Sequence, residues 1–253
     1  MSGDRHRSSH VVLVTGATGA IGFEIAAQAA EAGATVAVHG SRAESVAAAM
    51  TRLSARVPDV RLIAAPADFR RPGAIDAMVT DVVLQAGKLD AMIHCGIAGA
   101  PDITGVFAKT SPAGFAAHAA LVIGACQHLC FAALPHLSVR GGAIVVLVAD
   151  AGYYAAARQS VVGAAFGGLI SFVRNLAMET ARDGVRVHCI SLSFVADTPA
   201  FAAHAARAGR AIERAGLGLP TPSDIAPMAL FLCGPGSTKI TGQVISINGG
   251  LNA

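Results

Sequence analysis

The residues best suited to chemistry in this 253-residue chain lie in a glycine-rich segment near its start. The segment reads Thr15-Gly16-Ala17-Thr18-Gly19-Ala20-Ile21-Gly22, between a short apolar run and an alanine-rich stretch. Glycines at this spacing let the backbone turn tightly and approach a pyrophosphate where the following helix begins. Gly16, Thr18, Gly19 and Ile21 are therefore predicted to contact the phosphates of a dinucleotide.

A second candidate binding segment follows the next apolar run and reads His39-Gly40-Ser41-Arg42. It lacks the acidic residue that would accept hydrogen bonds from a ribose 2′-hydroxyl and repel a 2′-phosphate. Arg42 therefore favours NADP over NAD. The alternative is that Arg42 only begins a solvated helix.

Two further sets of residues could move protons. Tyr154 and Arg158 have the spacing of a tyrosine with a cation four residues on, and an arginine can stabilise a phenolate. The alternative is a loop tyrosine beside a solvated arginine. The other set is expected near the rim of a cleft, where its members could act as acid, base or nucleophile, or simply pack strand ends. It comprises His94, Cys95, Asp150 and His188.

The elements that must position these residues alternate along the chain. Longer alanine-rich helical patterns separate seven short apolar runs, at 11–14, 35–38, 60–64, 91–93, 143–148, 185–190 and 244–247. Such runs indicate strands covered by helices on both faces. We expect a basic tail over residues 1–9 and one α/β domain over 10–253. This domain is a Rossmann-like, doubly wound parallel sheet with ligands at the carboxyl ends of the strands.

The amino-acid composition excludes some classes of protein. With 53% apolar residues, 14% charged residues and a net charge of +3, the chain should fold around one core and offers no basic stripe for nucleic acid. No leader or membrane span is expected, so we predict a soluble cytoplasmic protein. The nearly apolar segment 115–134 suits a helix buried at a subunit contact. Its Cys126 and Cys130 favour core packing over a metal site.

Further motifs resemble the short-chain dehydrogenase/reductase (SDR) family nearly from end to end. The resemblance implies that Asp68 and the Phe69 amide hold an adenine ring. It also implies that Gly96 lies beside the cofactor, although His94-Cys95-Gly96 replaces the family's Asn-Asn-Ala-Gly. The motifs are the glycine segment, Ala67-Asp68, Leu89-Asp90, Leu134-Pro135, Asn175-Leu176-Ala177-Met178-Glu179, Val185-Arg186-Val187, Ser223-Asp224-Ile225-Ala226, Thr241-Gly242-Gln243 and Asn248-Gly249-Gly250.

In this family an asparagine, a serine, a tyrosine and a lysine transfer the proton. Counting back from Leu176 puts the tyrosine at Val162 and the lysine at Phe166. Counting along 142–152 puts the serine at Ala149, and the asparagine position falls at Val122 or at Leu121 beside it. None of these side chains can transfer a proton, so we expect no catalytic residue of the family's kind. We also expect no metal site.

Three hypotheses follow. The first is a pseudoenzyme, a non-catalytic subunit in an SDR hetero-oligomer with an active paralogue, in which Gly163, Gly167 and Gly168 let subunits approach closely. The second is an oxidoreductase or non-redox enzyme with a rebuilt cleft that uses Tyr154 and Arg158, or His94, Cys95 and Asp150. The third is a dinucleotide-binding sensor. With Phe166 in the lysine's place, binding at the nicotinamide end should be weakened or lost.

Overall fold

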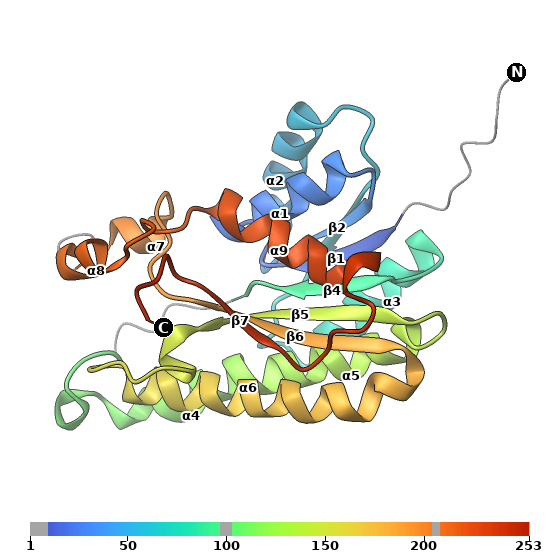
Figure 1. Cartoon of the computed structure of the whole chain (residues 1–253). Helices are drawn as coiled ribbons and strands as arrows, with labels where there is room; N and C mark the ends of the chain where they lie inside the picture. The colour runs from blue at the N-terminus through green and yellow to red at the C-terminus, as the bar shows by residue number, and fades with distance from the viewer. Residues whose placement is uncertain (1–9, 97–102, 204–207, 253) are drawn as a thin grey trace, which may run out of the picture.

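A seven-stranded parallel sheet forms the centre of the protein, as seen in a computed structural model (Figure 1). The structure describes residues 10–96, 103–203 and 208–252, so the predicted tail at 1–9 lies outside the described residues. The strand order is β3-β2-β1-β4-β5-β6-β7, and all neighbours run parallel. The prediction of one α/β domain with a doubly wound sheet is confirmed.

The strands are β1 (Val11–Thr15), β2 (Thr35–Gly40), β3 (Leu62–Pro66), β4 (Ala91–His94), β5 (Gly142–Ala149), β6 (Val185–Leu192) and β7 (Val244–Ile247). The α-helices are α1 (Ala20–Glu31), α2 (Ala43–Arg56), α3 (Ala74–Ala86), α4 (Phe115–Ala119), α5 (Ala125–Leu137), α6 (Ser160–Thr180), α7 (Pro199–Ala202), α8 (Gly209–Arg214) and α9 (Pro222–Cys233). Shorter turns are the 3-10 helices η2 (Phe107–Lys109), η3 (Pro112–Gly114), η5 (Asp150–Gly152), η6 (Ala181–Asp183) and η8 (Pro235–Ser237), and the π-helical turn η4 (Ala120–Gly124).

The inner strands are buried along their length because helices cover both faces of the sheet. Every residue of β1, β2 and β4 is buried, whereas β3 and β7, at the two edges, are only partly buried. The seven predicted runs match the seven strands. The third strand begins at Leu62 rather than at Val60, because the chain is still turning at Asp59, whose φ is 63°.

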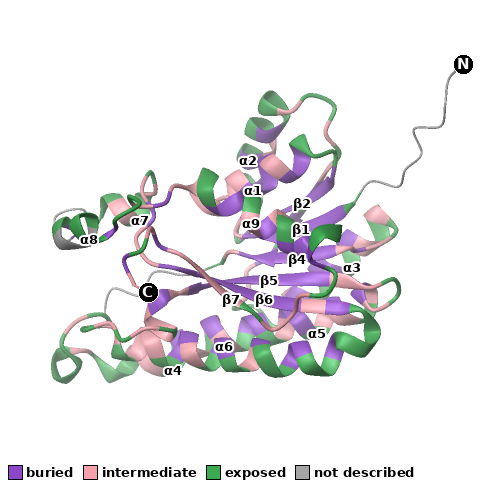
Figure 2. Ribbon diagram, viewed as in Figure 1, coloured by how far each residue is buried: buried purple, intermediate pink, exposed green. Residues whose placement is uncertain are grey.

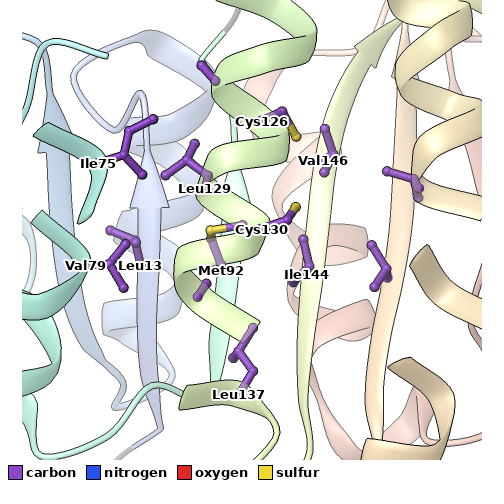
Figure 3. Packing of buried hydrophobic residues seen from close by; sticks show 14 of the residues in the cluster. Leu13, Ile75, Val79, Met92, Cys126, Leu129, Cys130, Leu137, Ile144 and Val146 are labelled. Carbon is purple, nitrogen blue, oxygen red and sulfur yellow. The ribbon is translucent and has the colours of Figure 1, made fainter. Parts of the chain in front are cut away.

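Two hydrophobic cores lie on opposite faces of the sheet, and buried residues fill the layer between the helices (Figure 2). Helices α3, α5 and α6 cover one face, and α1, α2 and α9 cover the other. Figure 3 shows Cys126 and Cys130 of α5 directed toward Ile144 and Val146 of β5, whereas Leu129 lies on the side of the helix nearer Ile75. Cys126 and Cys130 thus pack in the core.

Two long apolar helical segments cover this face, and one of them contains a π-helical turn. The segment 115–134 runs without a break through α4, the π-helical turn η4 and α5, and the residues at both junctions keep right-handed helical backbone angles. By length and hydropathy alone, two segments, Pro112–Leu137 and Ser160–Asp183, could also cross a membrane. Core helices pass the same test, and the inner residues of both segments belong to the core against the sheet.

The carboxyl ends of the strands form the edge on which a site can be built. The chain proceeds outward from β1 through β2 to β3, then returns to place β4 on the other side of β1. Ligands of such sheets bind where the strand order reverses. The loops after β1, β2, β4, β5 and β6 all reach this edge.

Candidate functional site

The glycine turn between β1 and α1 forms the first part of the site. Gly16 has a φ of 70°, and a Cβ there would lie 3.1 Å from the amide nitrogen of Gly96. A Cβ at Gly22 would lie only 2.3 Å from the Gly16 carbonyl oxygen. No side chain caps α1 at Gly19, and its first turn carries no acid. Bare backbone at a helix N-terminus fits a phosphate group.

His39, near the end of β2, holds the glycine turn in place through hydrogen bonds. Its Nδ1 accepts a hydrogen bond from the Gly16 amide (3.0 Å), and its Nε2 donates to the Ala67 carbonyl (3.0 Å). These partners assign the proton to Nε2. The ring also stacks on Phe69, with centroids 4.3 Å apart. Burial lowers the pKa of His39 to about 4, so the ring is neutral at pH 7 and joins the glycine turn to the end of β3.

The residues predicted to hold the adenosine end are brought to the same edge. The Asp68 carboxylate accepts hydrogen bonds from Nε (2.8 Å) and a terminal nitrogen (2.7 Å) of Arg70. This ion pair lowers the pKa of Asp68 to about 2. An adenine amino group that donated a hydrogen bond to Asp68 would therefore share its carboxylate with Arg70. Arg42 is exposed at the N-cap of α2, and Thr18 packs closely on Gly40. Ile21 lies in the first turn of α1.

The residues after β4 are unsuited to proton transfer. His94 Nδ1 lies 2.6 Å from the Thr15 hydroxyl oxygen, and burial, reinforced by His39, lowers the pKa of His94 to about 4. Burial raises the pKa of the Cys95 thiol far above its ordinary value, so the nucleophilic thiolate is disfavoured. His188, predicted near the same rim, is fully buried inside β6 instead.

A pocket of about 450 Å³ opens at the carboxyl ends of β5 and β6. Its walls come from the segment between 149 and 159, the end of β6 at 192–194, Arg214 of α8, and residues 251–252. Such a volume is in the range of small-molecule sites.

Asp150, in η5 directly after β5, is the acid of this pocket and is 4% exposed. Its Oδ1 accepts a hydrogen bond from the Ser191 hydroxyl (2.5 Å). Its Oδ2 accepts from the side-chain amides of Asn248 (2.8 Å) and Asn252 (3.1 Å). We call these four residues the Asp150 clasp. It joins the turn after β5 to β6 and to the segment after β7.

Comparison with known proteins assigns the family. A family model described as "Enoyl-(Acyl carrier protein) reductase" matches residues 16–252, and relatives align over nearly the whole chain. The chain belongs to the SDR family.

Three SDR relatives show how similar this chain is to known members of the family. Subunit BbsC of hydroxy(phenyl)methylsuccinyl-CoA dehydrogenase from Thauera aromatica is 31% identical over 96% of this chain and 94% of its own length. Subunit BbsD of the same dehydrogenase is 29% identical over 96% of both chains. The structure of an actinorhodin polyketide ketoreductase variant with NADPH superposes with a TM-score of 0.87 at 26% identity, covering 96% of this chain and 97% of that one.

The positions counted as the SDR tetrad carry apolar side chains, and of these positions Ala149 lines the pocket. Ala149 ends β5 and lines the pocket. Val162 is half-buried on α6, and Phe166, one turn on, is 2% exposed within the core. Val122 is buried in the π-helical turn η4, with Leu121 beside it.

One of the glycines predicted to serve subunit contact, Gly163, has a packing role within the chain. A Cβ at Gly163 would lie 2.6 Å from the Ala151 carbonyl oxygen, and one at Gly167 would lie 3.4 Å from that of Gly152. In turn, a Cβ at Gly152 would lie 2.6 Å from the Phe166 carbonyl carbon. Gly163 and Gly152 let η5 pack on α6 within the chain, because a Cβ at either would separate the two backbones, whereas a Cβ at Gly167 would make only an ordinary contact.

The alternative pair, Tyr154 and Arg158, is not brought together in an observed contact. The Tyr154 hydroxyl lies 3.1 Å from the Ser246 hydroxyl on β7. Arg158 is exposed, with a φ of 69°, and its carbonyl accepts a hydrogen bond from the Gly105 amide. The tyrosine thus pairs with a neutral hydroxyl.

The roles of several site residues are not apparent from the sequence. Ser191, Asn248 and Asn252 become partners of Asp150 only through the fold, and Arg214 reaches the pocket from a short helix far along the chain. The sequence around His39 shows only the absence of an acidic residue and does not indicate that His39 binds the glycine turn. The Gly249-Gly250 pair after Asn248, which marks a tight turn, is the one clue to the segment that closes the pocket.

Proposed function

We propose that this protein is a non-catalytic subunit of an SDR oligomer, assembled with an active paralogue in the cytoplasm. Phe166 carries the proposal. Counting along α6 puts it where the family has its lysine, and its ring is packed in the core. A phenyl ring in that place cannot stabilise a phenolate or pair with a cofactor ribose. Val162, at the tyrosine position, has no proton to give.

The outer faces of α5 and α6 support an assembly role. Within the most apolar 18 residues of each long helical segment, only 39% are buried, which leaves apolar surface uncovered. Phe131 of α5 is 76% exposed and Met178 of α6 is 79% exposed. Apolar surface of this kind is typical of subunit interfaces. The names of BbsC and BbsD, which are both subunits of one dehydrogenase, favour a hetero-oligomer.

Affinity purification from the native host, followed by native mass spectrometry, tests this proposal. We expect a stoichiometric complex with a second SDR chain that carries the complete tetrad, and no reductase turnover by this chain alone. A stable homotetramer without such a partner would contradict it.

A matched pair of variants locates the interface. Phe131→Glu should release the partner in size-exclusion chromatography, because a carboxylate cannot be buried in an apolar contact without a large cost. Leu84→Glu, on α3, starts from a side chain of the same 76% exposure and should leave the complex intact. Equal behaviour of the two variants would place the contact elsewhere.

Dinucleotide binding is a second candidate function, as in a sensor, and the bare glycine turn favours it. Gly16 and Gly22 let the turn pack tightly on its own backbone without a side-chain cap on α1, and Arg42 is exposed at the expected ribose side. The NADPH held by the ketoreductase relative supports the same ligand class. When bound in an active SDR, the nicotinamide supplies or accepts hydride. Here Phe166 offers that end no charged partner, so we propose binding through the phosphates and adenosine.

Calorimetry with NADPH and NADH tests this candidate. We expect NADPH to bind more tightly than NADH, and Arg42→Ala to weaken only NADPH because the guanidinium would pair with the 2′-phosphate. Arg182→Ala, on η6, is the control. No heat from either dinucleotide would remove the candidate.

An enzyme with a rebuilt cleft has less support. Its proton donors would be Tyr154 or Asp150, and the polar atoms of both are already engaged by Ser246 or by the Asp150 clasp. Tyr154→Phe tests it directly, because loss of a detected turnover in this variant would favour the enzyme.

A further inference from the structure

The pocket at the ends of β5 and β6 has a lining of mixed polarity, in which polar and apolar groups contribute similar shares of the surface. Its apolar side chains are those of the alanines after η5 and of Leu192, Phe194 and Leu251. A small apolar body would fit among these side chains.

The acid of the pocket is already satisfied. Both Asp150 oxygens accept hydrogen bonds within the Asp150 clasp, and the carboxylate is almost fully buried. Asp150 is therefore poorly placed to accept a hydrogen bond from a ligand.

The remaining polar groups of the lining include a cation. Arg214 donates one hydrogen bond from a terminal nitrogen to the Leu251 carbonyl (3.3 Å), which holds the side chain at the pocket. Within the described part of the chain, no carboxylate lies within ion-pair distance of its guanidinium. Gln159 and Ser193 add side chains that can donate hydrogen bonds.

We propose that this pocket binds a small monocarboxylate with an apolar body, the carboxylate paired with Arg214 and the body against Leu192 and Phe194. A guanidinium binds a carboxylate through two parallel hydrogen bonds, which a neutral isostere cannot reproduce. This binding needs neither a partner subunit nor a dinucleotide, so it stands apart from the proposed function.

Calorimetry on the purified chain with butyrate, benzoate, their amides and inorganic phosphate tests the proposal. We expect the carboxylates to bind, the amides to bind about tenfold more weakly or not at all, and the affinity to fall with salt. Equal binding of acid and amide would overturn the proposal. So would phosphate binding as well as butyrate, or no binding of any carboxylate up to about 10 mM.

Variants assign the binding to Arg214. Arg214→Gln should weaken benzoate at least about tenfold, and Arg214→Lys should retain part of the affinity because the charge remains. Arg182→Gln, exposed on η6, should bind like the parent. Urea unfolding of each variant confirms that it is folded. Unchanged benzoate affinity in folded Arg214→Gln would refute the assignment.

Discussion

Removing the carboxylate of Asp150 should destabilise the protein more than any other single change near the pocket. Asp150→Ala leaves the donors of Ser191, Asn248 and Asn252 without their acceptor in a buried place. A hydrogen bond to a charged group contributes about 1.5–3 kcal/mol. Because the three share one acceptor group and are not additive, we expect a loss of about 3–6 kcal/mol in the free energy of unfolding.

Asp150→Asn separates the loss of charge from the loss of hydrogen bonds. Its amide oxygen can accept from Asn248 and Asn252 while its nitrogen donates to the Ser191 hydroxyl, which is able to accept. This variant should lose only about 1–2 kcal/mol.

Urea unfolding at pH 7.5, with a common m-value, measures both variants. Asp81→Ala, an exposed position on α3, is the control and should change stability by less than about 0.5 kcal/mol. If Asp150→Ala lost less than about 1 kcal/mol, or if Asp150→Asn were the worse variant, the hydrogen bonds of the clasp would not have the strength assigned to them.

Three further predictions concern the rest of the site. His39 and His94 have pKa values of about 4 when folded and about 6.5 when unfolded, so protons favour the unfolded chain. The contribution of these histidines to the free energy of unfolding should be fully present above about pH 6.5 and fall toward pH 4. We expect a loss of about 2 kcal/mol per histidine between pH 7.5 and 5 in urea titrations, and a flat profile would contradict this. Phe166→Lys should cost about 3 kcal/mol or more by burying an ammonium, whereas exposed Ser171→Lys should be nearly neutral, and equal urea midpoints would refute the burial argument. Gly22→Ala should lower the melting temperature because its Cβ meets the Gly16 carbonyl at 2.3 Å, whereas Gly124→Ala, in open space on a helix, should not, and calorimetric scans distinguish the two.

The strands were predictable because each is a local apolar run that the sheet buries on both faces. The start of β3 was not predictable from the sequence. Val60 is apolar and resembles the first residue of a strand, although the chain is still turning at Asp59. The glycine turn was also predictable, since its strand, loop and helix are consecutive in sequence.

The other parts of the site depend on contacts between distant segments. His39 becomes a hydrogen-bond acceptor for Gly16 only when β2 lies beside β1. The packing of Gly163 against the turn after β5 is not apparent from the helix pattern. Asp150 looked like a possible acid because its three donors lie 41 to 102 residues further along.

The Asp150 clasp also sets an order of events during synthesis. Asp150 leaves the ribosome about 100 residues before the two asparagines that bind it, since they follow at separations of 98 and 102 residues. At about 5–20 residues per second, this delay lasts about 5–20 s. During that time the Asp150 carboxylate stays hydrated, so the turn after β5 cannot reach its final, buried position. The pocket is therefore among the last parts of the nascent protein to form, well after the glycine turn.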